Sequence, residues 1–252
     1  MTYLSTSDLA KAVGIHPNTV RRYVEWGLLP PVERSPAGYR RFTQRHLDCL
    51  RLARLVYSYE YPGKVLRQSG VQIIHAAVSG DLEGALAQAQ RHLALVLSER
   101  AQAELAAGLL ERWAQGPPSG MATQPLQIGQ AAQLLDVSID ILRNWERNGL
   151  VAVPRSLSNG YRRYGPAEIS RLRVIRMLSR AGYSLAAILR MLIQLDRGEK
   201  TGLRSALDTP RPDEDVYTAS DHWISTLNRQ MQPVNQIIAL VEEWIRAQAS
   251  AP

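Results

Sequence analysis

Two arginine pairs in matching surroundings are the residues with the clearest chemical purpose in this sequence. The segment Gly38-Tyr39-Arg40-Arg41-Phe42 recurs 122 residues later (160 − 38 = 122) as Gly160-Tyr161-Arg162-Arg163-Tyr164. Glycine accepts the positive φ of a tight hairpin turn, and a guanidinium group meets phosphate oxygens as a planar fork. One such segment alone is as often a solvated basic turn. Two copies predict two short β-hairpins, or wings, that contact a phosphate backbone.

The surroundings of the two segments also repeat, so the unit of duplication is the size of a domain. An ungapped offset of 122 residues holds from Leu4 to Phe42. It pairs several core and polar residues, which are Leu4 with Leu126, Ala10 with Ala132, Arg21 with Arg143, Gly27 with Gly149 and Leu28 with Leu150. The sequence therefore predicts two similar heads rather than a solenoid of short repeats.

The positive charge is concentrated in the same two heads. The chain carries a net charge of +7, with 30 Lys and Arg against 23 Asp and Glu. Residues 1–69 and 124–198 each hold 11 basic and 5 acidic residues, or +6. Residues 70–123 hold 3 and 5, and residues 199–252 hold 5 and 8, which gives −2 and −3. This segregation favours a polyanionic partner held by the heads.

Other functional classes find little support in the sequence. The five histidines are scattered without the spacing of a metal site, and no nucleophile motif appears, so we expect neither an enzyme nor a bound cofactor. They are His16, His46, His75, His92 and His222. The one cysteine, Cys49, excludes an intrachain disulfide and is expected to fill core space. No apolar run of about 18 residues and no signal pattern occurs, which predicts a cytoplasmic protein without a membrane partner.

The first head reads as a helix-turn-helix followed by a wing. We expect a helix over residues 6–13, capped by Thr6 or Ser7, and a second from His16-Pro17 to about Trp26. The second helix turns apolar residues inward, including Val20 and Tyr23. Its polar residues are left outward, namely Asn18, Thr19, Arg21, Arg22 and Glu25. The strands of the wing are expected in 28–34 and 40–43.

The second head follows the same plan. Ile128–Leu135 is the expected first helix, and Ser138 is the expected cap of the second. The outward residues there are Asp140, Arg143, Asn144 and Glu146, while Trp145 falls near the place of Tyr23. The second wing is expected over Val151–Tyr164.

Further helices are predicted after each wing, and each half ends in a long one. The shorter helices are expected over 44–59, 166–181 and 184–195, and 62–78 is expected to form one helix or two. A polar, partly acidic loop that contains a short helix is expected over 196–219. A long helix is expected over 81–113, with an apolar stripe through Leu82, Leu86, Ala89, Leu93, Val96 and Leu97 that continues through Leu105, Leu109, Leu110 and Trp113. A second is expected over 220–248, with an apolar stripe from Trp223 to Ile245 and a kink at Pro233. The Gly- and Pro-rich stretch 115–125 is the predicted linker.

These motifs resemble the DNA-binding domain of MerR-type transcription regulators. The resemblance is carried by Thr19 to Glu25, by Gly27-Leu28-Leu29-Pro30 and by Gly38 to Phe42. A second, more divergent copy is carried by Leu142 to Glu146 and Gly160 to Tyr164. The resemblance covers most of both halves.

The resemblance implies a mainly α fold in which winged helix-turn-helix heads are joined by a long antiparallel coiled coil. Such dimers typically bind a promoter spacer and change its geometry for RNA polymerase. By position, Arg21 and Arg143 match phosphate contacts of the recognition helix. The arginines Arg40, Arg41, Arg162 and Arg163, with Tyr39 and Tyr161, match wing contacts. The predicted DNA-binding residues are Asn18, Thr19, Arg21, Arg22, Tyr23, Tyr39, Arg40, Arg41, Asp140, Arg143, Asn144, Trp145, Tyr161, Arg162 and Arg163.

The chain departs from that family in holding two heads and two long helices, where a usual protomer has one of each. The predicted domains are a first head (1–69), a helical tail (70–114), a linker (115–125), a second head (126–198) and a C-terminal tail (199–252). We expect a monomeric pseudo-dimer, the alternative being a homodimer formed by exchange between chains. A second hypothesis is a small-molecule-binding protein that keeps this scaffold without regulating DNA. No effector is assigned from the sequence.

Overall fold

The computed structural model describes residues 3–58, 61, 63–115, 124–210 and 219–250 (the side chains of 219 and 220 aside). These residues are mainly helical, with one two-stranded antiparallel sheet. The chain forms two compact units that do not follow chain order. Unit 1 joins Met1–Ser98 to Leu227–Pro252, and unit 2 is Glu99–Thr226.

The first head opens with the predicted pair of helices, α1 (Thr6–Ala12) and α2 (Pro17–Glu25). The N-cap of α1 is Ser5, because its hydroxyl accepts from the Asp8 amide while the Asp8 carboxylate accepts from the Ser5 amide. The predicted caps, Thr6 and Ser7, instead belong to the first turn of the helix. Gly14 (φ +65°) and Gly27 (φ +69°) follow the two helices and allow the chain to turn sharply.

The wing and the next two helices complete the first head. Strands β1 (Glu33–Arg34) and β2 (Arg40–Arg41) pair antiparallel, with Arg34 opposite Arg40. The wing returns to the head through a bridge between Leu4 and Phe42, and the Phe42 ring is fully buried. Helix α3 (Gln44–Val56) ends before the predicted limit at 59, and α4 (Lys64–Ser79) is one continuous helix.

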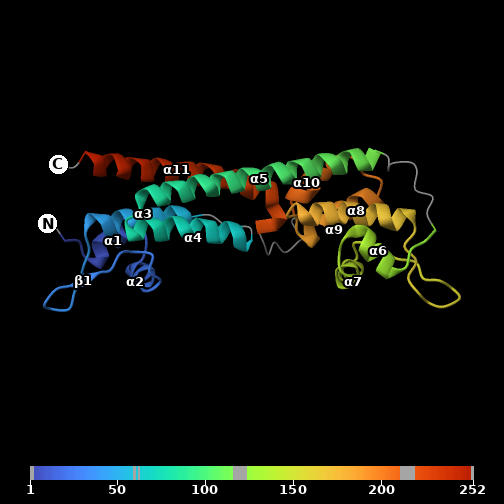
Figure 1. Ribbon diagram of the computed structural model, residues 1–252, viewed down its shortest axis with the longest axis horizontal. Coiled ribbons are helices and arrows are strands. Elements are labelled where there is room, and N and C mark those ends of the chain that lie inside the picture. The colour runs from blue at the N-terminus through green and yellow to red at the C-terminus, as the bar shows by residue number, and fades with distance from the viewer. Residues whose placement is uncertain (1–2, 59–60, 62, 116–123, 211–218, 251–252) are drawn as a thin grey trace. The chain divides into compact units, whose positions relative to one another are not determined.

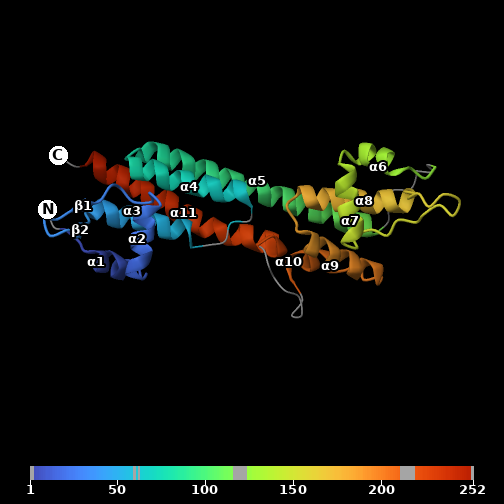
Figure 2. The same cartoon turned by 90° about the horizontal axis from the view of Figure 1, so that it is seen from below.

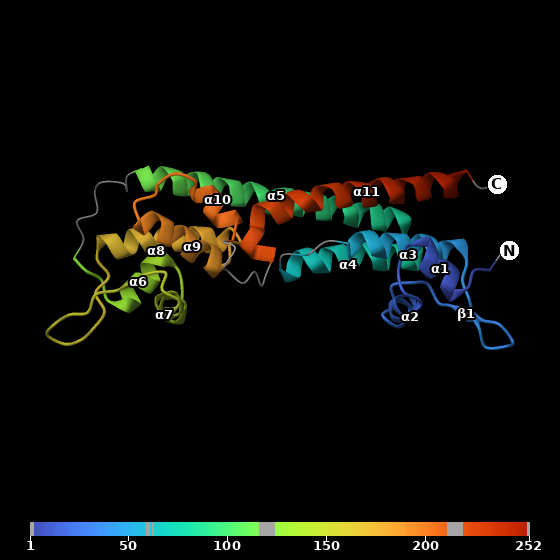
Figure 3. The same cartoon turned by 180° about the vertical axis from the view of Figure 1, so that it is seen from behind.

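The core of unit 1 takes in the C-terminal helix. Helix α11 (Trp223–Ala249) continues through Pro233, and its Ile237 and Val241 are fully buried in one core with Leu50 of α3 and Ala89 of α5 (Leu82–Gln115). Figures 1 and 3 show the end of α11 beside the first turns of α5 and close to α3. Residues more than 140 positions later in the sequence thus help to hold the first head.

The buried face of α5 is made largely of alanine, and the predicted apolar stripe is confirmed at Ala89, Val96 and Leu110 but not at three of its leucines. Leu97, Leu105 and Leu109 are exposed. The buried residues are Ala85, Ala89, His92, Val96, Ala103, Ala106, Ala107, Leu110 and Ala114. Apolar residues lie on more than one face of this helix, so the sequence pattern alone does not decide which face is buried. The face with small side chains is the buried one, because it lets neighbouring backbones approach closely. The predicted pairing of the two long helices as a coiled coil stays a prediction, and most of the predicted linker, 116–123, lies outside the described residues.

Unit 2 is built around the second head. Its helices are α6 (Ile128–Leu135), α7 (Ile139–Arg147), α8 (Pro166–Arg180), α9 (Leu185–Asp196), α10 (Leu203–Asp208) and the short 3-10 helix η1 (Ala219–His222). The later turns of α5 belong to this unit (Figure 2). The Tyr183 hydroxyl donates to the Ala103 carbonyl at 3.2 Å, and Arg204 pairs with Glu104 at 2.6 Å.

The segment predicted as a second wing does not form a two-residue strand pair within the described residues. It instead has two isolated bridges, Arg155 with Arg162 and Leu126 with Tyr164. Its tip is also one residue longer than that of the first wing. The Ser35 amide donates to the Tyr39 carbonyl, whereas the Ser156 amide donates to the Tyr161 carbonyl. An ungapped alignment of the two copies therefore misplaces the residues before the tip of this loop by one position, while the residues after the tip stay aligned. We refer to residues 151–164 as the second loop.

Candidate nucleic-acid interface

Helix α2 presents the first polar face. The ring of His16 caps it, with Nδ1 accepting from the Asn18 amide at 3.1 Å, and Pro17 occupies the first turn. Val20 is fully buried, which turns Asn18, Arg21 and Arg22 outward. Thr19, in the same first turn, is half-buried. A recognition helix contacts bases through its N-terminal turns, and three of these four predicted residues on α2 are exposed there.

Two contacts order this polar face. Arg21 donates through Nη1 to Asn18 Oδ1 at 3.0 Å, and the guanidinium of Arg22 lies 5.9 Å from the centre of the Trp26 ring. Trp26 is 58% exposed, an unusual position for an indole. This residue was not among the predicted functional residues. The sequence did hold a sign of its exposure, because Trp26 is the last residue before Gly27, where the recognition helix ends.

Tyr23 and Trp145 are placed in the core rather than on the exposed face. Tyr23 is 6% exposed, with ring centroids of Trp26 and Tyr57 each at 6.0 Å, and burial raises the pKa of its hydroxyl. Trp145 is 4% exposed. Both rings fix the orientation of a recognition helix on its head, and the outward side chains around them form the surface that a ligand would meet.

The first wing exposes Arg34 and Tyr39, whereas Arg40 and Arg41 are half-buried. Tyr39, at the tip, is 76% exposed. Arg34 donates through Nη1 to the Gly38 carbonyl at 3.1 Å, and the guanidinium of Arg41 lies 5.0 Å from the centre of the Tyr3 ring. Among the described residues, no ion pair involves Arg40 or Arg41. The positive charges of this wing are therefore available to phosphate.

Helix α7 repeats the arrangement with an acid in place of an amide. The Ser138 hydroxyl caps the helix by accepting from the Ile141 amide at 3.2 Å. Arg143 bonds to Asp140 at 3.3 Å, in the way that Arg21 bonds to Asn18 in the first head. The Asn144 Oδ1 accepts from Asn148 Nδ2 at 3.0 Å. The second recognition face is thus less positive than the first.

The second loop is tied to the recognition helix by an ion pair. Arg162 Nε donates to Glu146 Oε2 at 2.6 Å, and this hydrogen bond raises the pKa of the arginine. Arg155 donates to the Gly160 carbonyl at 3.3 Å, which matches the Arg34 contact of the first wing. Tyr161 and Arg163 remain exposed. The structure therefore brings together most of the predicted surface residues in each head, but leaves the two heads chemically different.

The described residues contain no cluster of three or more His, Cys, Asp or Glu side chains that could hold a metal ion. None of the helices in this part of the chain is both long and apolar enough to cross a membrane. The arrangement is suited to holding phosphate with arginine and to reading base edges with short polar side chains.

Comparison with known proteins finds the same motif twice. Residues 5–42 match the model for "MerR family regulatory protein", and residues 126–195 match the model for "MerR HTH family regulatory protein". No known solved structure matches the chain.

Individual relatives match between about a third and a half of the chain. A "Probable heavy metal-dependent transcriptional regulator" of Haemophilus influenzae is 30% identical over 120 residues, 47% of this chain and 84% of the relative. A "Mercuric resistance operon regulatory protein" of Serratia marcescens is 36% identical over 122 residues, 48% of this chain and 76% of the relative. The "HTH-type transcriptional regulator CueR" of Escherichia coli O6:H1 is 36% identical over 91 residues, 36% of this chain and 58% of the relative.

Proposed function

This chain belongs to the MerR family of DNA-binding transcription regulators, and from that premise we propose that a single chain binds promoter DNA with both of its heads. It then acts as a pseudo-dimer. The observation that carries the proposal is the pairing, in one chain, of two capped recognition helices, each with a buried aromatic beneath and an arginine face above.

In each head, the first wing or the second loop has a different role from the recognition helix. The wing arginines, with Arg21 and Arg143 on the helices, meet phosphate oxygens and fix the register of the protein on the duplex. Asn18, Thr19 and Arg22 meet base edges in the first half-site, and Asp140 and Asn144 do so in the second. Tyr39 of the first wing and Tyr161 of the second loop lie against the sugar-phosphate backbone.

The predicted consequence of holding two heads on one duplex is a change in promoter geometry that RNA polymerase detects, inside the cytoplasm. The composition of unit 1 supports a pseudo-dimer made within one chain, because the end of α11 is part of the first head's core. Such a protein is monomeric in solution. Light scattering at micromolar concentration measures this directly, and a mass of two chains would favour the homodimer formed by exchange.

The function is tested by selecting binding sites from genomic DNA fragments with the purified full chain, followed by titration of the selected duplex. We expect saturable binding of one chain per site and strong competition by salt. The opposing hypothesis is a small-molecule-binding protein on the same scaffold. That hypothesis predicts no enrichment of any fragment over successive rounds, and such a result would overturn the proposed function.

A further inference from the structure

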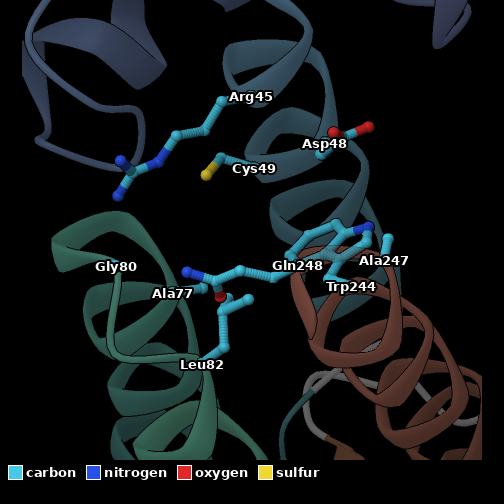
Figure 4. Close-up of a pocket in the computed structure, with 9 residues that line it drawn as sticks. All are labelled: Arg45, Asp48, Cys49, Ala77, Gly80, Leu82, Trp244, Ala247 and Gln248. Carbon is cyan, nitrogen blue, oxygen red and sulfur yellow. The ribbon is translucent and has the colours of Figure 1, made fainter. Parts of the chain in front are cut away.

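Unit 1 contains a cavity of about 280 Å³ beneath the first head (Figure 4). Three segments enclose it: α3, the turn from α4 to α5, and the last turns of α11. Arg45 and Cys49 reach it from α3, Leu82 from the start of α5, and Trp244 and Gln248 from α11. Its lining contains none of the residues proposed above to contact DNA.

The lining combines an apolar wall with hydrogen-bond donors. Trp244 and Leu82 provide apolar surface, and Ala77 and Ala247 add to it. Arg45 uses Nη2 to donate to the Val78 carbonyl at 3.1 Å, and no ion pair among the described residues involves its charge. Asp48, also in the lining, accepts from Gln44 at 2.9 Å and lies 3.5 Å from Arg51. Arg45 is therefore the charged group that remains for a ligand, and it favours an anion.

A thiophilic metal does not fit this lining. Burial raises the pKa of the Cys49 thiol to about 11, so the sulfur stays protonated at neutral pH. A metal site of this type also needs several thiolate or imidazole ligands, and the described residues hold no cluster of three candidate ligands. A cavity of this size suits a ligand smaller than an ordinary drug molecule.

The matching positions in unit 2 carry different side chains, and these bond within the protein. At the offset of 122, Arg45 matches Ala167, Asp48 matches Ser170 and Cys49 matches Arg171. The Trp113 indole donates to Ser170 Oγ at 2.8 Å. The long side chain of Arg171 donates to the Leu150 carbonyl and to Asp196, both at 2.6 Å. Unit 2 therefore has an alanine where unit 1 has Arg45, and where unit 1 has a small thiol it has Arg171, whose charge is paired with Asp196.

We propose that the cavity of unit 1 binds one small aromatic carboxylate per chain, with the carboxylate on Arg45 and the ring against Trp244. A symmetric dimer would offer two equivalent places, whereas this chain offers one, beneath its first head. The proposal rests on the proposed function in one respect only, namely that the bound ligand would regulate DNA binding. Ligand binding itself is measured on the DNA-free protein, so either proposal can fail while the other stands.

Isothermal titration of the full chain with 1-naphthaleneacetate tests the proposal. We expect one ligand per chain. Arg45→Ala, which installs the residue found in unit 2, should weaken binding at least about tenfold, because it removes a charge-assisted hydrogen bond. Arg45→Lys keeps the charge but loses the planar fork of donors, so its affinity should lie between those of the wild type and Arg45→Ala. The control is Arg67→Ala, which removes an exposed arginine of α4 outside this cavity and should leave binding unchanged.

A second pair of variants locates the ring. Trp244→Phe should abolish the quenching of protein fluorescence by 1-naphthaleneacetate, and Trp113→Phe should preserve it. Ala247→Leu, at an exposed position of the lining, should block binding by filling the cavity without disturbing the core. No saturable binding, two ligands per chain, or full affinity in both Arg45→Ala and Ala247→Leu would overturn the proposal.

Discussion

Arg162 of the second loop is bonded through Nε to Glu146 of α7 at 2.6 Å, and the first head has no counterpart of this pair among its described residues. At the offset of 122, Glu146 matches Val24, an uncharged residue, while Arg162 matches Arg40. Arg143 likewise has the acid Asp140 as its neighbour, where Arg21 has the amide of Asn18. Two arginines of the second head are thus paired with carboxylates, so the first head has more unpaired positive charge that can bind phosphate.

The first prediction concerns the wings. Arg40→Ala with Arg41→Ala should weaken binding to all DNA sequences, and should flatten the log-log salt dependence by about 0.9 for each phosphate that is no longer neutralised. Arg162→Ala with Arg163→Ala should have a smaller effect, because Arg162 already bonds to Glu146. Fluorescence anisotropy across a salt series measures both. Equal slopes in the wild type and both double mutants would show that neither wing touches DNA.

The second prediction concerns acid stability. The His92 ring is fully buried in α5, neither ring nitrogen has a hydrogen-bond partner in the described residues, and its nearest aromatic neighbour is Tyr61, at 5.8 Å. Desolvation lowers the pKa of His92 to about 4, from about 6.5 in the unfolded chain. The unfolded state therefore binds the proton first. The free energy of unfolding is therefore highest well above pH 6.5 and falls as the pH drops toward 4. At pH 5 this one group should have lowered it by about 2 kcal/mol.

Urea unfolding at pH 7.5 and pH 5 measures this decrease in stability. In His92→Leu the decrease should shrink by the contribution of that one group. The control, His75→Leu, changes an exposed histidine of the neighbouring α4 and should behave as the wild type does. If His92→Leu is destabilised on acidification as much as His75→Leu, the buried imidazole is not the group that titrates.

The third prediction concerns the contribution of the C-terminal helix to the first head. Ile237 is fully buried in the core shared with α3, so Ile237→Ala should destabilise unit 1 by about 2–5 kcal/mol. Faster hydrogen exchange should then appear in α1, α2 and α3, at the opposite end of the sequence. Gln236→Ala, at an exposed position beside it, is the matched control. Unchanged protection of the first head in Ile237→Ala would mean that α11 does not support it.

The helices of this protein could be predicted from the sequence, whereas several of its contacts could not. Ser138, Pro17 and the glycines after each helix are local signals, and the structure confirms the helices that they bound. The Ser5 cap was missed because three neighbouring residues can all accept from an N-terminal amide. The predicted apolar stripe of α5 was wrong at Leu97, Leu105 and Leu109, because leucine and alanine each follow a helical period there and only the neighbours decide which face is buried.

The contacts that were missed join residues far apart in the sequence. The apolar stripe of α11 shows that it needs a partner, but not that the partner is the first head. The sequence also places Glu146 outward, without showing that a loop residue 16 positions away would reach it. The cavity beside Trp244 depends on three segments coming together, so no local pattern could indicate it.

The fourth prediction concerns base reading by the first recognition helix. Arg22 is exposed on α2 and can donate two hydrogen bonds to guanine. Arg22→Asn, which installs the residue found at the matching position 144, should lower discrimination against a wrong base in the first half-site by about 1–3 kcal/mol. Competition with duplexes altered at one base pair at a time measures the change. Lys11→Ala, on α1, is the control and should leave the order of base preference unchanged.

The most direct test of a single-chain regulator with two unlike heads is a comparison of operators. Two symmetric duplexes are built, one from each half of the selected site, and both compete with the native duplex for the wild-type chain. We predict that the native site binds most tightly, and that the duplex made of two first half-sites is held better than the duplex made of two second half-sites. If either symmetric duplex binds as tightly as the native one, the two heads read the same sequence and the account is contradicted.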